Sequence, residues 1–416
     1  MIRMLLPAFI GLFLLAGTPS SGRPIVFEEH FQDSTLRLDY VFAGDAAHQE
    51  IFLHKMARTP VWAGRRHHLE EPLLQGNGQI RVLDPESGAC LYATSFSSLF
   101  QEWTVTPEAR HTQKAFEAGF QVPFPRKAVN VEITLMDTRG QVSARMMHPL
   151  DPADILIRPV AHNGLVTMTV WQGGAPEEVV DVVIVSEGYG ASEAAKFFQD
   201  AGRAADALFS HEPFASHKDC FAVRAVFAPS QQSGVSIPHE GAWRATAVSS
   251  HFDTFYVERY LTTSAIWEIE DIIGTVPYEH IIVLANTGIY GGGGIFNSLT
   301  IMNSDHPTFV PVLVHEFGHA FGGLADEYAY GSDGSDPTYP AGTEPWEPNI
   351  TTLTDFASKW QDMMQQEGVG LFEGAGYELH GVYRPAQECR MRNNECKVFC
   401  PVCTRAIERM IDYYCR

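Results

Sequence analysis

The spacing of apolar residues changes once along the chain and divides it into two parts. Residues 23–173 hold short runs in which apolar and polar positions alternate, as they do from Val129 to Met136. This period of two is typical of half-buried strands. Asn163-Gly164, between the apolar runs 155–160 and 165–171, is a signal for a β-hairpin. We therefore predict an antiparallel β-sandwich for residues 23–173, with this hairpin near its end.

After a linker at residues 172–176, the apolar pattern is that of an α/β layer domain. Residues 179–185 form a β-branched run that only Asp181 interrupts, and this run predicts a strand buried on both faces. The other predicted elements are, in order, a helix at 197–209, strands at 221–227 and 281–285, and a helix after Pro311. The chain as a whole is thus predicted to be an α+β multidomain protein whose second domain spans residues 178–416.

The N-terminal segment has the composition of a cleaved signal peptide. Arg3 precedes an almost uninterrupted apolar run at residues 5–16, and small and turn-forming residues follow at 17–22. The run is short for a bilayer span, although a short membrane anchor is the alternative. We predict a signal peptide at residues 1–22 and export to the periplasm, the cell surface or the medium. The rest of the sequence predicts no stable membrane span.

Composition indicates a globular protein with an acidic surface. Hydrophobic residues make up 45% of the 416 residues and charged residues 19%, unlike the composition of disordered chains. The formal net charge of −21 disfavours binding to nucleic acid, and its simplest effect is on solubility. The sequence carries no signal for the oligomeric state.

His315-Glu316-Phe317-Gly318-His319 indicates a specific chemistry. Residues four apart on a helix lie on the same face, so His315 and His319 can direct their imidazoles at one metal ion. Glu316 then lies beside the open coordination position, where its carboxylate can take a proton from water. The pattern predicts zinc, with both histidines as ligands and Glu316 as the general base.

A catalytic zinc site needs a third protein ligand and keeps its fourth position open. Gly322 and Gly323 predict the end of the helix, since glycine accepts the left-handed conformation needed there, and the chain can then return to the metal. We assign Asp326 as the third ligand and keep Glu327 as the alternative. A further alternative is that both carboxylates only orient the histidines.

Five of the seven cysteines lie within the last 28 residues, at positions 389, 396, 400, 403 and 415. In an oxidising compartment, disulfides that fix this C-terminal segment are the expected state. The alternative is a structural zinc site, because Cys400 and Cys403 have the spacing of zinc ligands. The odd number of cysteines leaves at least one outside any intramolecular pair.

The segment HEFGHAFGGLADEY, from His315 to Tyr328, resembles the signature of the immunoglobulin-A peptidase family of bacterial zinc metallopeptidases. Other segments are also similar to that family, namely VVIVSEGY at 182–189, residues 291–296, CRMR at 389–392 and FCPVC at 399–403. The resemblance covers residues 175–416 and extends more weakly into the N-terminal domain. It implies a metzincin-like fold, bound zinc and endopeptidase activity on a protein or peptide, without naming the substrate.

Two further features fit the fold that this resemblance implies. Met391, just before a predicted C-terminal helix at 401–414, is a candidate for the methionine turn beneath the zinc histidines of metzincins, or else a core residue. The glycine-rich run 291–302 is predicted to be an edge strand to which an extended substrate adds, or else a loop before a core strand. Candidate donors to a developing oxyanion are Tyr328, Tyr330, His306 and Arg392.

These observations support three hypotheses of function. The first is an exported zinc-dependent endopeptidase in which Glu316 is the general base. The second is a surface protein that binds a protein or a glycan and keeps a structural zinc helix. Glu316 argues against this, because a purely structural site needs no base. The third is a zinc amidase that acts on cell-wall peptides.

Overall fold

The computed structural model describes residues 24–330 and 338–415, and a six-stranded sheet forms the centre of its second half. Its strands are β9 (Val166–Gln172), β10 (Val180–Glu187), β11 (Phe221–Phe227), β12 (His280–Ala285), β13 (Gly292–Ile295) and β14 (Leu299–Asn303). They lie in the order β13-β14-β12-β10-β11-β9. The four inner strands are parallel, while β13 and β9 are antiparallel to their neighbours at the two edges.

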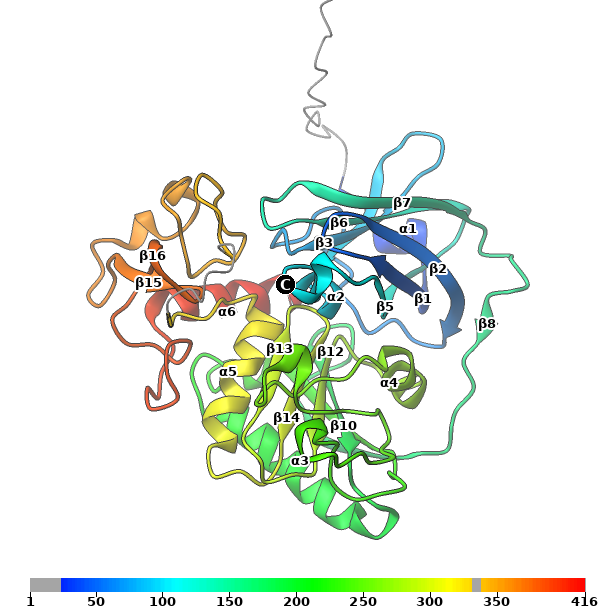
Figure 1. Ribbon diagram of the computed structural model, residues 1–416. Coiled ribbons are helices and arrows are strands. Elements are labelled where there is room, and N and C mark those ends of the chain that lie inside the picture. The colour runs from blue at the N-terminus through cyan, green and yellow to red at the C-terminus, as the bar shows by residue number, and fades with distance from the viewer. Residues whose placement is uncertain (1–23, 331–337, 416) are drawn as a thin grey trace, which may run out of the picture.

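Helices cover both faces of this sheet (Figure 1). They are α3 (Ala194–Phe209), α4 (Ile266–Ile273), α5 (Phe309–Gly322) and α6 (Pro401–Cys415). In β10, Val182 and Ile184 belong to the apolar cluster of α3, α5 and α6, whereas Val183 and Val185 belong to that of α4. Every residue of β10 is buried, which confirms the strand that the β-branched run predicted.

The N-terminal domain consists mainly of strands in two four-stranded sheets. Its elements are α1 (Phe27–His30), β1 (Phe31–Gly44), β2 (Gln49–Thr59), β3 (Gly78–Leu83), β4 (Cys90–Phe96), α2 (Leu99–Thr104), β5 (Lys114–Pro125), β6 (Val129–Met136), β7 (Val142–Leu150) and β8 (Arg158–Pro159). The sheet orders are β5-β1-β2-β8 and β4-β3-β6-β7. Apolar side chains of both sheets, such as Leu38 and Ile133, share one core. The predicted α+β class, with strands in the N-terminal domain, is confirmed.

The hairpin predicted around Asn163-Gly164 does not form. β8 pairs with β2 in the N-terminal domain, whereas β9 pairs with β11 of the six-stranded sheet. The Asn163 side chain donates hydrogen bonds to the carbonyls of Asp271 and Ile272, at 3.1 and 2.6 Å. The prediction was wrong because a turn signal is local, while the choice of strand partner depends on burial against distant residues.

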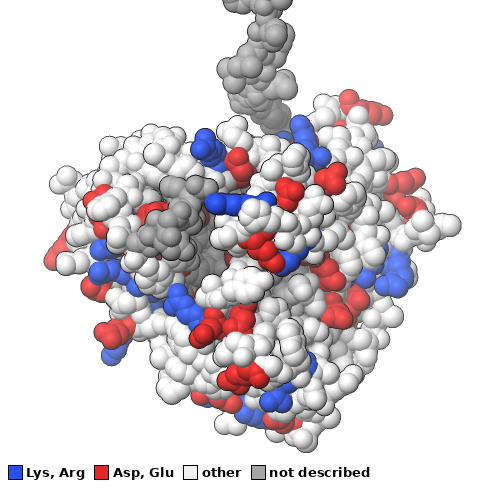
Figure 2. All heavy atoms as spheres, viewed as in Figure 1, with Lys and Arg blue, Asp and Glu red and all other residues white. Residues whose placement is uncertain are grey.

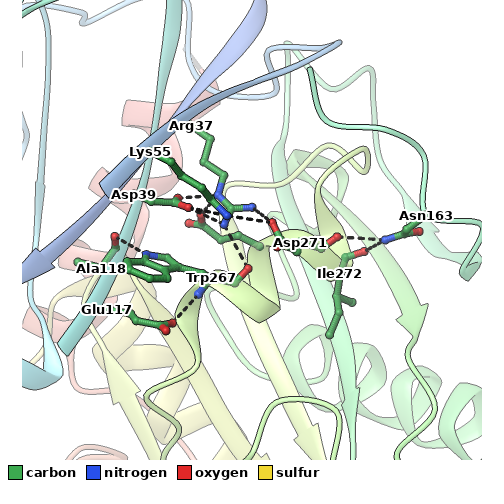
Figure 3. A network of polar contacts seen from close by, with 10 residues as sticks. Arg37, Asp39, Lys55, Glu117, Ala118, Asn163, Trp267, Asp271 and Ile272 are labelled. Carbon is green, nitrogen blue, oxygen red and sulfur yellow. Dashed lines mark hydrogen bonds and ion pairs between the residues drawn. The ribbon is translucent and has the colours of Figure 1, made fainter. Parts of the chain in front are cut away.

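A buried network of charges joins the N-terminal domain to helix α4 (Figure 3). Arg37 of β1 is 1% exposed, and its Nε lies 2.7 Å from Asp39 of the same strand and 2.6 Å from Glu270 of α4. Lys55 brings a second positive charge 3.2 Å from Asp39. Breaking a buried pair leaves an uncompensated charge, so this network holds the N-terminal domain against α4.

A separate two-stranded sheet, drawn in orange in Figure 1, lies between α5 and α6 in the sequence. It consists of β15 (Phe372–Ala375) and β16 (Glu378–Arg384). A backbone bridge joins Tyr377, in the turn of this hairpin, to Ala329. The hairpin therefore holds the segment that follows α5, where the predicted metal ligands lie.

Two further predictions concern the charge of the surface and the absence of a membrane span after the signal peptide. Acidic and basic side chains are interspersed over the face drawn in Figure 2. In the part of the chain that the structure describes, every helix is too short or too polar to cross a lipid bilayer. The predicted signal peptide, residues 1–22, lies outside the described residues.

Candidate active site

Helix α5 carries His315 and His319 and ends where the sequence predicts. Its C-cap is Gly323, whose φ of 61° is left-handed. The Gly323 N–H donates to the His319 carbonyl at 3.0 Å and so caps the last turn. The chain then turns back towards the helix, and Asp326 reaches the two histidines.

Three possible ligand atoms lie close together beside α5. His315 Nε2 lies 3.0 Å from His319 Nε2, and Asp326 Oδ1 lies 3.0 and 3.3 Å from these two nitrogens. The other ring nitrogen of His315 donates to the Arg390 carbonyl at 3.0 Å. That of His319 donates to the Leu324 carbonyl at 2.5 Å. Because a carbonyl only accepts hydrogen bonds, both Nδ1 atoms carry a hydrogen, and both Nε2 atoms face the carboxylate.

This arrangement fits a metal ion. Asp326 Oδ1 is buried without a hydrogen-bond partner, while its Oδ2 accepts from the Tyr377 hydroxyl. Two bare imidazole nitrogens and a carboxylate oxygen repel one another unless a cation lies among them. A tetrahedral zinc ion with bonds of about 2.0–2.1 Å separates its ligands by about 3.3 Å, close to the distances found.

The same cluster has the electrostatics of a cation site. Burial alone would lower the pKa of His319, but the Asp326 carboxylate raises it to about 9. Burial would raise the pKa of Asp326, yet His319 and His315 hold it well below its usual range. Burial also raises the pKa of Glu316, which favours proton uptake by this carboxylate. Without a metal, the cluster holds a proton that an entering metal must displace.

Glu327, the alternative third ligand, lies in a different cluster. Its Oε1 is 3.0 Å from Asn349 Nδ2 and 3.0 Å from Cys403 Sγ, and its side chain is fully buried. Burial raises the pKa of Glu327 well above its usual range. The structure thus brings Asp326, and not Glu327, to the histidines.

Met391 lies beneath α5. It is fully buried, and a Cβ added at Gly318 would stand 2.9 Å from its Sδ. The Met391 carbonyl accepts from the Glu327 N–H at 2.9 Å, and the preceding carbonyl, that of Arg390, holds His315. This short segment therefore supports the histidine helix from below.

The glycine-rich run folds as two strands and not as one edge strand. β13 is the edge of the sheet, while β14 lies inside it, so the edge-strand prediction holds only for β13. Tyr260 forms an isolated bridge with Gly292 at one end of that edge. A Cβ at Gly294 would lie 2.2 Å from the Glu316 carbonyl oxygen. This glycine therefore allows β13 to pack closely against α5.

The candidate residues line a cleft of about 1130 Å³. His315, Glu316, His319 and Asp326 lie in its wall, together with residues 292–295 of β13. The N-terminal domain also contributes, with Gln75, Gln101, Glu102, Thr104 and Met136 among the lining residues. Of the four candidate oxyanion donors, Tyr328, Tyr330 and Arg392 line the cleft, whereas His306 contacts Thr308 at 2.7 Å and does not.

The expected disulfides do not form. All seven cysteines are free in the structure, and all lie within its described residues. Cys389, Cys400 and Cys403 instead converge with Glu327. The zinc-like spacing of Cys400 and Cys403 thus belongs to a real cluster of side chains.

Two family models match this chain. The model of the IgA Peptidase M64 matches residues 168–368 and 363–411, more than half of the chain, and that of the Peptidase M64 N-terminus matches residues 26–147. The chain belongs to the IgA peptidase M64 family. None of the curated proteins compared with the chain matches it. Membership in the M64 family implies a metallopeptidase with a protein substrate.

The sequence did not predict some of the residues that line the M64 cleft. Tyr377 binds the far oxygen of Asp326 and lies 51 residues away along the chain. Tyr260 donates a hydrogen bond to Glu102 of the N-terminal domain, and burial raises the pKa of Glu102 to about 7. All three side chains line the cleft. No local pattern marks these residues, because they reach the site through long-range contacts.

Proposed function

We propose that this M64 family member is an exported zinc-dependent endopeptidase that hydrolyses peptide bonds within proteins. The observation that carries the proposal is the convergence of His315 Nε2, His319 Nε2 and Asp326 Oδ1 within 3.3 Å of one another, in the wall of a large cleft. Export rests on the signal-peptide composition of residues 1–22.

His315, His319 and Asp326 would hold the zinc ion. Two nitrogens and one oxygen are suitable zinc donors, and three protein ligands leave one position open to the cleft. Bound there, zinc would act as a Lewis acid on the scissile carbonyl and would lower the pKa of a coordinated water. The Arg390 and Leu324 carbonyls keep both imidazoles in the tautomer that this task requires.

Glu316 would move the proton. One of its carboxylate oxygens and one ring nitrogen of each histidine lie within 4.8 Å of one another. The carboxylate would accept a proton from the attacking water and donate it to the nitrogen of the leaving amine. Since burial raises the pKa of Glu316, the carboxylate is a stronger base than an exposed one.

Tyr330 is the donor that we favour for the developing oxyanion. Its hydroxyl oxygen accepts a hydrogen bond from Arg259 Nη2 at 3.0 Å. The hydroxyl hydrogen then remains available to a substrate oxygen in the cleft, which Tyr330 lines. An extended substrate would pair with β13 along the part of its edge that lines the cleft, beyond the bridge between Tyr260 and Gly292 and next to the candidate ligands.

The placement of Met391 supports a metzincin-like arrangement. Its side chain lies against Gly318, in the turn of α5 between the two histidines. A buried methionine at this place gives the histidine helix an apolar floor, and the carbonyl before it orients His315.

Digestion of casein tests the proposal. The purified protein should cleave casein internally, lose activity with a chelator and regain it with zinc. Glu316→Gln should retain its zinc and lose about 10²–10⁴-fold in kcat/KM, the contribution of general acid–base catalysis. Glu268→Gln, an exposed glutamate of α4, is the matched control and should be unchanged. Full activity of Glu316→Gln would remove the role given to this residue.

Parallel digests of casein and of cell-wall peptides distinguish the other two hypotheses, the amidase and the binding protein. Intact casein, with release of amide-linked groups from cell-wall peptides, would favour an amidase. Zinc retention without hydrolysis of either substrate would favour a binding protein.

A further inference from the structure

A second cluster of metal-binding side chains lies behind the first. Glu327, Cys389, Cys400 and Cys403 each offer one ligand atom, and these atoms all lie within 4.8 Å of one another. The four side chains are 0–3% exposed. None of them lines the cleft. The cluster is therefore a closed set of four donors, unlike the open set of three at the histidines.

The distances within the cluster are those of a tetrahedral thiolate site. Cys389 Sγ lies 3.7 Å from Cys403 Sγ, and a zinc ion with Zn–S bonds of about 2.3 Å separates two sulfurs by about 3.8 Å. Glu327 Oε1 lies 3.0 Å from Cys403 Sγ and 4.0 Å from Cys400 Sγ. An oxygen and a sulfur on the same ion would be separated by about 3.5 Å, between these two values.

One atom of the cluster lacks a partner. Glu327 Oε2 is buried without a hydrogen bond, although Oε1 accepts from Asn349 at 3.0 Å. A buried carboxylate of this kind is costly unless a cation or a further donor compensates it. The backbone N–H groups of Cys400 and Cys403 point at the sulfurs of Cys389 and Cys400, at 3.3 and 3.5 Å, and such donors stabilise thiolates.

A disulfide does not account for this arrangement. Three thiols can form only one bond, which would leave the third sulfur buried beside a buried carboxylate. A metal ion satisfies all four groups at once, because thiolates and a carboxylate are its ligands and their protons leave when it binds.

We propose that Cys389, Cys400, Cys403 and Glu327 hold a second, structural zinc ion. The donor set is soft and thiolate-rich, as in structural zinc sites, and it is sealed from the cleft. Cys400 directly precedes α6, and Cys403 lies in its first turn, where the helix dipole favours negative sulfur.

The second ion would position the first site from two sides. Glu327 follows Asp326 directly, so an anchored Glu327 fixes the approach of Asp326 to the histidines. Cys389 precedes Arg390, whose carbonyl holds His315 at 3.0 Å. A hydrogen bond of 2.9 Å from the Glu327 N–H to the Met391 carbonyl links the two segments.

Metal analysis of the purified full chain tests the proposal. We expect two zinc ions per chain, and one in Cys403→Ser. Cys396→Ser is the matched control, since this cysteine is in the same segment but outside the cluster, and it should keep two ions. Asp326→Ala should also drop to one ion, but from the other site. A single ion in the wild type, or a disulfide among the three cysteines in a non-reducing peptide map, would overturn the proposal.

Cobalt spectroscopy separates the two sites without using activity. Wild type and Asp326→Ala, stripped of metal under reducing conditions and reloaded with Co²⁺, should both show sulfur-to-cobalt charge transfer in the near ultraviolet. Cys403→Ser should lose most of this absorption. If Cys403→Ser does not fold, protection of wild-type Cys389, Cys400 and Cys403 from alkylation by added zinc replaces it, and labelling at an unchanged rate counts against the site. The absorption is expected even if Glu316→Gln proves fully active, so failure of the peptidase proposal is recognised separately.

Discussion

The histidine cluster and the cysteine cluster differ in their number of donors and in their access to the cleft. They are nevertheless neighbours in the sequence, since Asp326 belongs to the first and Glu327 to the second. Asp326 joins two imidazoles in the wall of the cleft, and this set of three leaves a position for a reactant. Glu327 joins three sulfurs in a sealed core, and this set of four leaves none. Access and the number of donors, more than distance along the chain, distinguish a reactive metal site from a structural one.

The local backbone explains how neighbours serve different clusters. The Asp326 carbonyl accepts from the Gly376 N–H at 2.9 Å, while the N–H of the next residue, Glu327, donates to the Met391 carbonyl at 2.9 Å. With the backbone held from these two segments, the Asp326 side chain lies against the histidines in the cleft wall, and the Glu327 side chain lies against Cys403.

The largest expected effect comes from exchanging the two carboxylates for alanine. Asp326→Ala should lower kcat/KM by about 10³-fold or more, since a catalytic metal contributes several kcal/mol. Glu327→Ala should lower it by about 10–100-fold, since it acts through the position of other ligands. Casein assays and metal analysis of both variants check this. Equal losses of activity, with loss of the same ion, would mean that the clusters are not separate sites.

Stepwise removal of metal should separate function from stability. The open cluster is expected to give up its ion first, so activity should vanish while one ion per chain remains and the melting temperature is nearly unchanged. Removal of the second ion should then lower the melting temperature, because binding energy of a structural ion is folding energy. Metal content, activity and thermal melting are measured at each chelator concentration. Simultaneous loss of both ions and of stability would contradict this order.

Tyr377→Phe should weaken the first cluster alone. The Tyr377 hydroxyl donates to Asp326 Oδ2, and loss of such an outer contact costs about 10–100-fold in metal affinity or activity. Titration with zinc, read through activity, gives the affinity. Tyr383→Phe, in the neighbouring strand β16 and outside the cleft, is the control. An unchanged zinc affinity of Tyr377→Phe would show that this hydroxyl does not hold the ligand.

The smallest effect is expected for Met391→Leu. The side chain fills space under α5, and a change that conserves volume costs less than about 1.5 kcal/mol of stability. Both ions should remain bound, because the carbonyls and N–H groups of this segment are untouched. Denaturant unfolding and metal analysis test this expectation. Loss of either ion would mean that the sulfur itself supports the metal sites.

Local signals allowed prediction of much of the candidate site. The helix carrying His315, Glu316 and His319 follows from its apolar spacing, and the glycine cap that returns Asp326 to it follows from Gly322-Gly323. The sequence favoured Asp326 and left Glu327 as the alternative, because spacing along the chain does not show which of two adjacent side chains faces the helix.

Features that depend on distant contacts could not be predicted. Tyr377, Tyr260 and Glu102 reach the cleft from other parts of the fold, and no periodicity marks them. The cysteines were expected to form disulfides because of the predicted compartment, whereas their convergence involves Glu327, more than 60 residues earlier in the chain. The strand β9 was assigned to the wrong sheet for the same reason.

The path of β9 determines where this molecule can be divided. A shortened peptidase that starts at residue 173 lacks β9, which forms one edge of the six-stranded sheet, and leaves β11 with an open edge. Open edges recruit other chains, so such a fragment is expected to aggregate. A fragment that starts before Asn163 keeps β9. It also keeps the Asn163 side chain, which attaches the segment between β8 and β9 to the carbonyls of Asp271 and Ile272 in α4. The boundary between the two domains therefore lies between β8 and β9, before the linker predicted at residues 172–176.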